Sequence, residues 1–527
     1  MADVLVVGAG PVGLTMAAEL ARHGVRPRIV DRLAAPLPYC RAIGVTPRTL
    51  EVYDDMGIAR PMIDAGLWLE GVRIIGPDGS VRDVVPDFSD LPYGPLAVRQ
   101  PETERVLAGH LASFGVAVER GVTLVGLMQD DDGVSVTLEH ADGRREAARF
   151  AWVVGCDGAH SAVRKALGVA FEGEAMPMGF MLGEVAMRPA PPRGFAVRAV
   201  RPRENDAPDM FIAVPVAGRD RFRVSALAPM AAGAAEHGLS TESAGPDLAA
   251  LQAVADRLMP EKVALSEMTW SSYFRISMRL AARYRVGRAF LAGDAAHIHP
   301  PTGGQGMNTG IQDAYNLAWK LALVVRGVAG EALAASYEAE RRPVGADVVA
   351  RTQAASMKLG REDGRESRLA DTQILVGYRE SPIVGAVGES DAASVGAGDR
   401  APDATGLARA HVAHPIRLHD VLRGTAHVLL VWSDAADGSE RARLEALAAG
   451  LAARHGDLVR VVAVAPAPAE APVGVPLYVD AAGGFAAAYA PAAGAAWLVR
   501  PDGHVGLCAR PWSETAIAAH LAGLLSI

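Results

Sequence analysis

The residues with the clearest chemical pattern lie in one stretch, between positions 288 and 327. A short apolar strand there ends in Gly293-Asp294, and a loop rich in glycine and proline leads into a long helix that begins near Asn308. Glycines let the backbone lie against a flat polar ligand, and the N–H groups at a helix start favour negative charge. The Asp294 carboxylate can accept hydrogen bonds from a sugar-alcohol chain. A reduced flavin has both a ribityl chain and a negatively charged ring, so the stretch predicts a flavin site.

The long helix after this loop is predicted to bury one face. Arg326 lies in its last turn and Gly327 just beyond it, as the C-terminal ends of helices prefer. Its apolar residues recur at the i, i+3, i+4, i+7 spacing of a buried helical face; they are Ile311, Ala314, Tyr315, Ala318 and Leu321.

A phosphate-binding pattern opens the chain. An apolar strand at 3–7 precedes glycines at Gly8, Gly10 and Gly13, an amphipathic helix follows, and a second strand ends at Asp31. In a βαβ unit such glycines permit a tight turn, close approach to a pyrophosphate and close packing of helix on strand. The acid after the second strand can accept hydrogen bonds from ribose hydroxyls. The pattern predicts a bound dinucleotide and does not distinguish NAD from FAD.

Asp157 is a third candidate ligand-binding residue. It follows the apolar strand at 152–156 and precedes Gly158, and Ser161 is a predicted N-cap of the next helix. We expect this strand to be central in the sheet, which places Asp157 at the carboxyl edge where doubly wound folds bind ligands. The alternative is a plain Asp-Gly turn.

Arg41 and Gln100 each allow two interpretations. Arg41 lies in a loop punctuated by proline, where it can neutralise a pyrophosphate or make a surface salt bridge. Gln100 opens a predicted helix, where it can hydrogen-bond a ligand or cap the helix.

Composition excludes several classes of protein. The chain has 527 residues and a net charge of -8, and no basic block is present, which argues against nucleic acid or an anionic membrane as a partner. Cys40, Cys156 and Cys508 are far apart, so neither a disulfide scaffold nor a zinc ribbon is expected, and a reducing cytoplasm fits. We read no signal peptide and no membrane span. His297-x-His299 has no suitable partners for a metal, and none is expected.

The predicted fold class is α/β with an insertion and an added C-terminal domain. The first domain covers 1–170 and returns at 281–395, where further helices follow. Strand-like segments between 171 and 280 predict an inserted β-sheet domain that covers the ligand. A linker rich in small residues lies between 379 and 406, and the last domain covers 401–527.

The last domain has the element order of a thioredoxin fold. Strands are predicted at 427–432, 458–464 and 477–479, a helix at 440–453, a hairpin near 501–503 and a final helix at 513–525. Thioredoxins carry their redox cysteines after the first of these strands, where this chain has residues 432–437, WSDAAD. Cys508 alone cannot form a redox pair. We therefore predict a structural domain that serves packing or dimerisation.

Three motifs together resemble one family. They are GAGPVG near the N-terminus, GCDG before a helix, and LAGDAAHIHPPTGGQGMNTGIQDAYNLAWKLA. The chain resembles the FAD-dependent class A aromatic hydroxylases, which include phenol, hydroxyphenylpropionate and aromatic-polyketide monooxygenases, over residues 1 to about 395. The resemblance implies a Rossmann-like FAD-binding domain with an inserted β-sheet substrate domain, and the thioredoxin-like domain resembles that of the phenol and polyketide subgroup.

The resemblance also implies a set of cofactor-binding residues. The AMP half of FAD is held by residues that match Gly8, Gly10, Gly13 and Asp31. Arg32, next to Asp31, is also predicted to bind the cofactor. Asp157 belongs to a motif that serves both FAD and NAD(P)H, and Asp294 is implied to bind the ribityl hydroxyls. The remaining matches lie near the pyrophosphate and ribityl chain (Arg41, Gln100), at the adenine (Leu124) and along the isoalloxazine (Pro301, Gly303, Met307, Asn308).

In this family NADPH or NADH reduces the flavin, and the reduced flavin with O2 gives a C4a-hydroperoxide that an electron-rich phenolate attacks. No second dinucleotide signature is present, as this implies. His297 and Pro301 are the candidate catalytic residues; His297 is either a base or structural. Phenol hydroxylases of the group carry an acid in the loop after Arg41, whereas residues 41–45 (RAIGV) have none. A simple phenol activated by that acid is therefore not expected.

These patterns predict a cytoplasmic, FAD-dependent, NAD(P)H-consuming monooxygenase that hydroxylates a phenolic aromatic compound and tailors an aromatic polyketide. The alternatives are Baeyer–Villiger insertion on a polyketide ketone, hydroxylation of a small phenol in catabolism, a flavin oxidase or dehydrogenase, and a non-catalytic flavin carrier. The predicted partners are a small aromatic substrate and O2, and a homodimer is possible.

Overall fold

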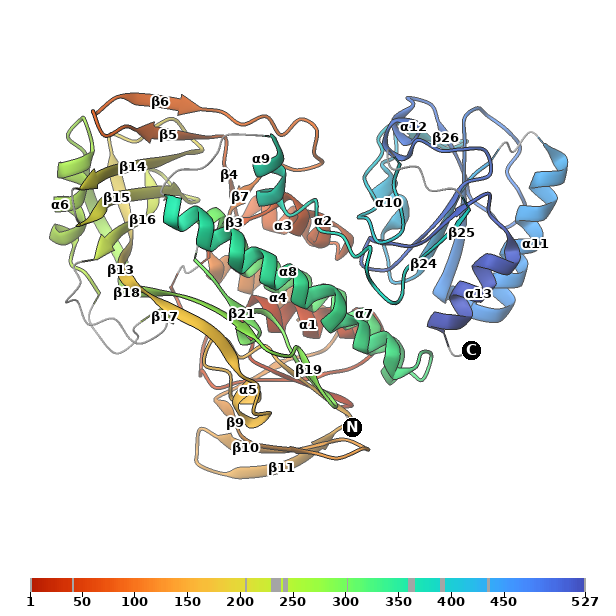
Figure 1. The fold of residues 1–527 in the computed structure, drawn as a ribbon, viewed down its shortest axis with the longest axis horizontal. Coiled ribbons are helices and arrows are strands. Elements are labelled where there is room, and N and C mark those ends of the chain that lie inside the picture. Colours follow the sequence, from red (N-terminus) through yellow and green to blue (C-terminus); the bar gives the residue numbers. More distant parts are fainter. Residues whose placement is uncertain are drawn as a thin grey trace.

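A six-stranded sheet in the order β19-β20-β12-β1-β2-β8 lies at the centre of the computed structural model (Figure 1). The structure describes residues 2–39, 42–203, 206–228, 238–239, 245–300, 302–358, 365–388, 394–433 and 437–525. All neighbouring strands of this sheet are parallel except the edge pair β19 and β20. The strands are β1 (Val4–Val7), β2 (Arg28–Asp31), β8 (Val118–Arg120), β12 (Trp152–Gly155), β19 (Arg285–Val286) and β20 (Ala289–Leu291).

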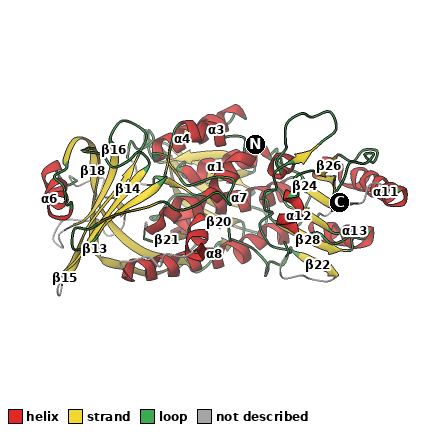
Figure 2. Cartoon of the chain, turned by 90° about the horizontal axis from the view of Figure 1, so that it is seen from above, coloured by secondary structure: helices red, strands yellow, loops and turns green. Residues whose placement is uncertain are grey.

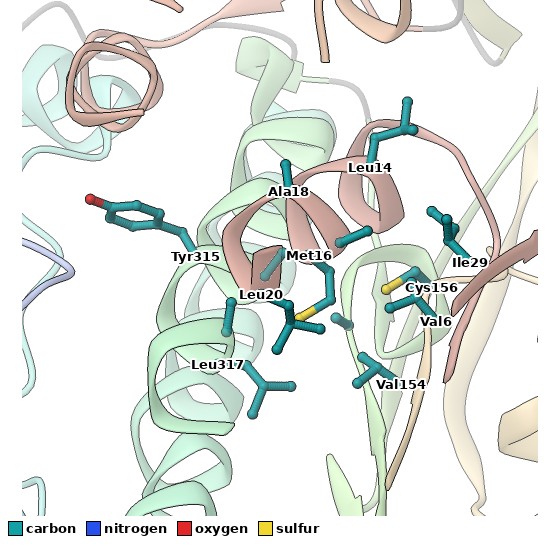
Figure 3. Close-up of a cluster of buried hydrophobic side chains, with 14 of the residues drawn as sticks. Val6, Leu14, Met16, Ala18, Leu20, Ile29, Val154, Cys156, Tyr315 and Leu317 are labelled. Carbon is teal, nitrogen blue, oxygen red and sulfur yellow. The ribbon is translucent and has the colours of Figure 1, made fainter. Parts of the chain in front are cut away.

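Helix α1 (Pro11–Arg22) packs between this sheet and helix α7 (Gln305–Val325). Figure 3 shows Met16 and Leu20 of α1 between Val154 of the sheet and Leu317 of α7. Because β1 is apolar at every position and fully buried, it needs cover on both faces, as parallel strands do.

Helix α7 differs from its prediction in two ways. It begins at Gln305, three residues before the predicted start, and it ends at Val325. The predicted apolar face is buried, but so is every residue from Asn308 to Leu323. This is because α1, helix α8 (Glu331–Lys358) and the C-terminal domain all pack on α7, which makes it a core helix rather than an amphipathic surface helix.

A nine-stranded sheet lies beside the first, in the order β17-β18-β13-β16-β15-β14-β5-β6, with β21 paired to β18. Helix α6 (Leu248–Leu258) covers its outer face, and the inner face looks toward α8 (Figures 1 and 2). The strands are β5 (Gly71–Ile75), β6 (Val81–Val84), β13 (Phe171–Arg188), β14 (Phe195–Arg203), β15 (Asp206–Pro215), β16 (Arg221–Ala228), β17 (Gly238–Leu239), β18 (Ala264–Ala281) and β21 (His297–Ile298).

The hairpin β5–β6 adds to the sheet from outside the range 171–280, because β5 pairs in parallel with β14. We therefore propose that the inserted domain comprises residues 171–281 together with 71–84.

Smaller elements complete the first domain. The short helices and turns are α2 (Pro47–Asp55), α3 (Ala59–Asp64), α4 (Gln100–Ser113), α5 (Ala162–Ala166), η1 (Gly293–Ala295), η2 (Thr302–Gly304) and α9 (Arg365–Thr372). The remaining strands are β3 (Gly44–Val45), β4 (Leu67–Trp68), β7 (Leu96–Ala97), β9 (Val122–Gln129), β10 (Val134–His140) and β11 (Arg145–Phe150).

The C-terminal domain is a seven-stranded sheet in the order β22-β28-β27-β24-β25-β26-β23. Its β24 is parallel to β25 and antiparallel to β27, which is antiparallel to β28, and this confirms the predicted order of strands. Strand β22 belongs to this sheet although it lies in the predicted linker. The elements are β22 (Gly385–Gly388), β23 (Leu407–Ala408), α10 (Leu418–Leu422), β24 (His427–Trp432), α11 (Gly438–His455), η3 (Gly456–Leu458), β25 (Val459–Ala465), β26 (Leu477–Asp480), α12 (Gly484–Tyr489), β27 (Ala496–Val499), β28 (Val505–Arg510) and α13 (Glu514–Leu524).

The C-terminal domain shares a core with the first domain. Trp319 and Leu323 of α7 and Leu333 of α8 belong to the same buried cluster as Leu447 of α11 and Leu521 of α13. Within the part of the chain that the structure describes, no helix combines the length and hydropathy needed to cross a membrane.

Candidate active site

Three turns from distant parts of the sequence meet at one edge of the central sheet. Val7 pairs with Gly155, and Gly155 pairs with Leu291, so β1, β12 and β20 end at the same level. The turns that follow these strands contain the Gly8–Gly13 motif, Asp157 and Asp294. This is the carboxyl edge, where open parallel sheets bind ligands.

Glycines are required where these turns touch. Gly8 has φ +100°, and a Cβ there would lie 2.4 Å from the carbonyl oxygen of Cys156. A Cβ on Gly13 would lie 1.8 Å from the carbonyl oxygen of Gly8. A Cβ on Gly10, by contrast, would meet nothing within 4 Å among the described residues apart from its chain neighbours and its own helix. Gly8 and Gly13 thus serve the packing of turn, strand and helix, and Gly10 leaves open space at the start of α1 for a phosphate.

The Gly293-Asp294 turn is pressed against both α1 and α7. A Cβ on Gly310 of α7 would lie 2.9 Å from the Cα of Gly293, and a Cβ on Gly293 would lie 2.8 Å from Val12 of α1. Gly293 and Ala295 are buried, whereas the Asp294 between them is exposed. This arrangement holds the Asp294 carboxylate outward beside both helices, as the predicted contact with a ribityl chain requires.

Asp31 binds the glycine-rich turn directly. Its Oδ2 accepts a hydrogen bond of 2.7 Å from the N–H of Ala9, and its Oδ1 accepts one of 2.8 Å from Leu33. Arg32 beside it is exposed. Leu124 is a buried core residue of β9, and its contact with an adenine stays a prediction, as do the ligand contacts of Asp31 and Arg32.

Asp157 caps α5 with one oxygen only. Its Oδ2 accepts from the N–H groups of Ala162 at 2.6 Å and Val163 at 3.2 Å, while its Oδ1 is buried without a hydrogen-bond partner among the described residues. Burial raises the pKa of this carboxyl. A buried acceptor without a partner is costly. The surroundings of Oδ1 therefore favour a role in binding a ligand hydroxyl over the alternative of a plain Asp-Gly turn.

Asn308 links the loop that precedes α7 to the strand β3. This loop, which follows Gly293-Asp294 and is predicted to border the isoalloxazine, is called the flavin loop. Its Oδ1 accepts from the N–H of Thr46 at 3.0 Å, and its Nδ2 donates to the carbonyl oxygens of Gly44 at 2.8 Å and Gly304 at 2.7 Å. Because these bonds use both N–H groups of the amide, Asn308 shapes the loop, and its predicted place along the isoalloxazine stays a prediction. Met307 is half-buried beside it, and Gly303 has φ +77°, a conformation that favours glycine.

Gln100 does not cap its helix. Its Oε1 accepts from the N–H of Ala42 at 3.2 Å and its Nε2 donates to Glu104 at 2.9 Å, so it holds the backbone of Ala42 in place. Arg41 and Pro301 lie outside the described residues, and their predicted roles stay predictions.

Asp313 of α7 has a role that no local sequence pattern indicates. Its Oδ2 accepts from the N–H of Gly293 at 3.1 Å and lies 2.7 Å from Nε2 of His297, and its Oδ1 accepts from Nε of Arg341 at 2.8 Å. Burial would raise the pKa of Asp313, but Arg341 and His297 hold it below its usual range. The buried carboxylate therefore positions the turn that carries Asp294.

His297 and His299 differ in their surroundings. His297 is buried, and its Nε2 is engaged by Asp313. His299 lies with Nδ1 2.9 Å from the carbonyl oxygen of Pro300, which assigns the proton to Nδ1 and leaves Nε2 as an acceptor without a partner among the described residues. Burial lowers the pKa of His299 to about 4, so its ring is neutral at neutral pH. In the part of the chain that the structure covers, no group of three His, Cys, Asp or Glu side chains is placed to hold a metal ion.

The chain is similar to known proteins over most of its length. A family model described as a FAD binding domain matches residues 1–352. The chain is 41% identical over 368 residues to a rifampicin monooxygenase of Streptomyces venezuelae, which covers 70% of this chain and 74% of that protein. It is 32% identical over 530 aligned residues to the pentachlorophenol 4-monooxygenase of Sphingobium chlorophenolicum, with coverage of 96% and 93%. The crystal structure of aklavinone-11 hydroxylase with FAD and aklavinone matches with a TM-score of 0.79 and 26% identity over 100% of this chain and 99% of that one.

The chain belongs to the family of FAD-binding aromatic monooxygenases. It is a flavin-dependent aromatic monooxygenase that binds FAD, and NADPH or NADH is the reductant typical of the family. The orphaned Asp157 Oδ1, the open space at Gly10 and the outward Asp294 all fit the pyrophosphate and hydroxyls of FAD. The α/β fold class and the family predicted from the motifs are confirmed.

Proposed function

We propose that this enzyme hydroxylates a phenolic, multi-ring aromatic compound of the polyketide type. The observation that carries the proposal is the inner face of the nine-stranded sheet. Phe180, Leu182 and Met278 form a buried cluster there, with Phe274 packed against it. Val349 of α8 also packs against this cluster, so the cluster lies between the sheet and the FAD-binding part of the chain. An apolar cluster of this kind, formed by large side chains from neighbouring strands, suits a flat hydrocarbon framework larger than one phenol ring.

The names of the relatives support this substrate class. Rifampicin and aklavinone, which appear in those names, are multi-ring compounds. The relative named for pentachlorophenol matches nearly the whole chain, so a small phenol is the second candidate. The absence of a carboxylate at 41–45 disfavours it.

FAD, when bound, supplies electron transfer from NAD(P)H and the activation of O2. The protein residues hold and enclose it. Gly10 and the start of α1 accept the pyrophosphate, and Asp294 holds the ribityl hydroxyls. Asp313 and Arg341 fix the Asp294 turn, and the apolar cluster excludes water from the substrate.

The test is NADPH and NADH consumption under air with a panel of phenols and polycyclic quinones. We expect a multi-ring phenol to stimulate consumption and to leave as a product with one added hydroxyl. The Asp294→Ala variant should lose flavin and turnover together. Equal consumption with and without every panel member would contradict the proposal, and a ring-expanded ester or lactone from a ketone would replace it with Baeyer–Villiger insertion. The homodimer stays a prediction, which light scattering of the purified protein tests.

A further inference from the structure

The inner face of the nine-stranded sheet changes in polarity from one row of side chains to the next. Cross-strand partners point to the same face, so the register defines the rows. Phe180 pairs with Leu227 on one side and Phe274 on the other, which gives an apolar row. Two residues further along β13, Leu182 pairs with Ser225 and Ser272, which gives a row with two hydroxyls.

The third row is charged. Glu184 pairs with Arg223 of β16 and with Trp270 of β18. Glu184 is buried, and its Oε1 lies 2.9 Å from Nη2 of Arg99 and 3.2 Å from Nη2 of Arg221. Arg99 and Arg221 therefore bind one carboxylate, and Arg223 lies beside Glu184 in the same row. Glu267 lies 3.9 Å from Arg221, so three arginines and two carboxylates leave an excess of one positive charge at this end of the face. Such an excess favours an oxygen that bears negative charge.

Trp270 in this row has a buried donor without an acceptor. Its indole Nε1 is buried and has no hydrogen-bond partner among the described residues. An indole N–H can only donate, and a buried donor left unpaired costs free energy. Trp residues at binding surfaces therefore use the ring for apolar contact and the N–H for a partner.

The position of Trp270 places this donor near the flavin loop. Its ring centroid lies 5.9 Å from that of Tyr39, and the indole packs against the small cluster that contains Ile43. The next residue, Gly44, is held by Asn308 at the start of α7. Trp270 also packs against the apolar cluster of Phe180 and Phe274. It thus contacts the sheet, Tyr39, the cluster of Ile43 and the apolar row.

We propose that Trp270 determines substrate specificity by donating its indole N–H to an oxygen of the substrate. This inference rests on the proposed function and adds the orientation of the substrate. The oxygen-bearing edge lies at the charged row, and the hydrocarbon edge lies against the apolar row. The indole N–H needs an acceptor, and the arginines of the same row favour negative charge. The favoured oxygen is therefore a phenolate or carbonyl acceptor. A ring system of the same shape that lacks this oxygen leaves the N–H unpaired and binds less tightly.

The test compares two probes of equal shape, 2-naphthol and 2-methylnaphthalene, with the FAD-bound enzyme. Their Kd values are measured by calorimetry or by the change in flavin absorption, and the ratio of the two is the readout. We expect the wild type to prefer 2-naphthol, and Trp270→Phe to lower that preference by about tenfold, the effect of one lost hydrogen bond. Flavin content of each variant shows whether the fold is kept.

The matched control is Phe274→Leu, which removes ring contact on the same strand without touching a donor. It should weaken both probes alike and leave the ratio unchanged. A Trp270→Phe ratio equal to that of the wild type would overturn the inference, as would a wild type that binds the two probes equally. Either result with naphthol-stimulated, product-forming NAD(P)H consumption intact overturns only the role of Trp270. A wild type that binds neither probe and shows no stimulated consumption contradicts the proposed function as well.

Discussion

At the scale of single residues, the two outer glycines of the first motif do different work from the middle one. Gly8 needs a positive φ and has the backbone of Cys156 against it, and Gly13 has the carbonyl of Gly8 against it. Gly10 is the N-cap of α1 with φ −76°, a conformation open to any residue, and it faces open space. Two are therefore required by the fold, and we expect the third, Gly10, to be required by the ligand.

This division predicts opposite outcomes for two alanine variants. Gly8→Ala should lower the free energy of unfolding of the apoprotein by about 1–3 kcal/mol, because it combines a left-handed backbone with a clash. Gly10→Ala should leave apoprotein stability unchanged and weaken FAD binding by tenfold or more, about the effect of blocking one phosphate contact. Urea denaturation and FAD titration measure the two effects. Equal losses in both assays for both variants would contradict the assignment.

Local patterns of residue types predicted the turns of the site. They did not predict contacts between residues that are far apart in the sequence. Asp294 and Gly8 stand out because a turn and its strand are adjacent in sequence. The role of Asp313 depends on Arg341, which is on another helix, and neither carries a local motif. Trp270 lies on β18 and carries no local motif either, because strand register across the sheet decides which side chains share a face.

At the scale of elements, α7 and α8 are joined to the C-terminal domain by a buried ion cluster. Glu340 of α8 lies 2.6 Å from Nζ of Lys320 on α7 and 2.7 Å from Nη1 of Arg500. Arg500 also pairs with Asp502 in the β27–β28 turn. Burial would raise the pKa of Glu340, but Arg500 and Lys320 hold it well below its usual range. The cluster is buried, so each charge depends on its partners.

Removing one partner from this cluster should be strongly destabilising. Arg500→Met leaves Glu340 and Asp502 without their shared cation, and we expect a loss of about 3–5 kcal/mol in the free energy of unfolding. The control is Arg60→Met, which breaks an exposed pair with Asp64 and should leave stability unchanged. Urea denaturation of both variants decides. If Arg500→Met unfolds like Arg60→Met, the cluster does not hold the two domains together.

Helices and strands formed by short local runs of residues could be predicted from the sequence. The pairing of these strands into sheets was harder to predict. The strand at 427–432 matches β24 because an apolar run between polar turns is a buried strand in most settings. The pairing of β5 with β14, and of β22 with β28, joins segments more than a hundred residues apart, and no pattern in the sequence marks either pair.

At the scale of the whole molecule, neutral histidines lie where the C-terminal domain meets the first. His427 of β24 packs edge-on against Trp319 of α7, with ring centroids 5.4 Å apart. Burial, with the charge of Arg500, lowers the pKa of His427 to about 4, and burial and the same arginine lower that of His520 to about 4. Both rings are therefore neutral in the folded protein at neutral pH.

As pH falls, the free energy of unfolding should therefore decrease before the carboxylates become protonated. The unfolded chain takes up a proton on His427 near pH 6.5, whereas the folded chain resists until about pH 4, so stability falls as pH drops through that window. For this one residue the loss between pH 7 and pH 5 is about 2 kcal/mol. The His427→Asn variant should show a shallower fall in thermal stability over that range. A variant with the same pH slope as the wild type would show that His427 is not held neutral.

The central claim is that the three turns at the edge of the first sheet bind FAD so that an oxygen atom is transferred to an aromatic substrate. The most direct measurement supplies the FAD-bound enzyme with NADPH or NADH, a multi-ring phenol and oxygen-18 gas, and determines the mass of the product by mass spectrometry. The structure predicts a hydroxylated product that carries one oxygen-18 atom. A product without the label, formed while NAD(P)H is consumed, would identify an oxidase or dehydrogenase and contradict the account.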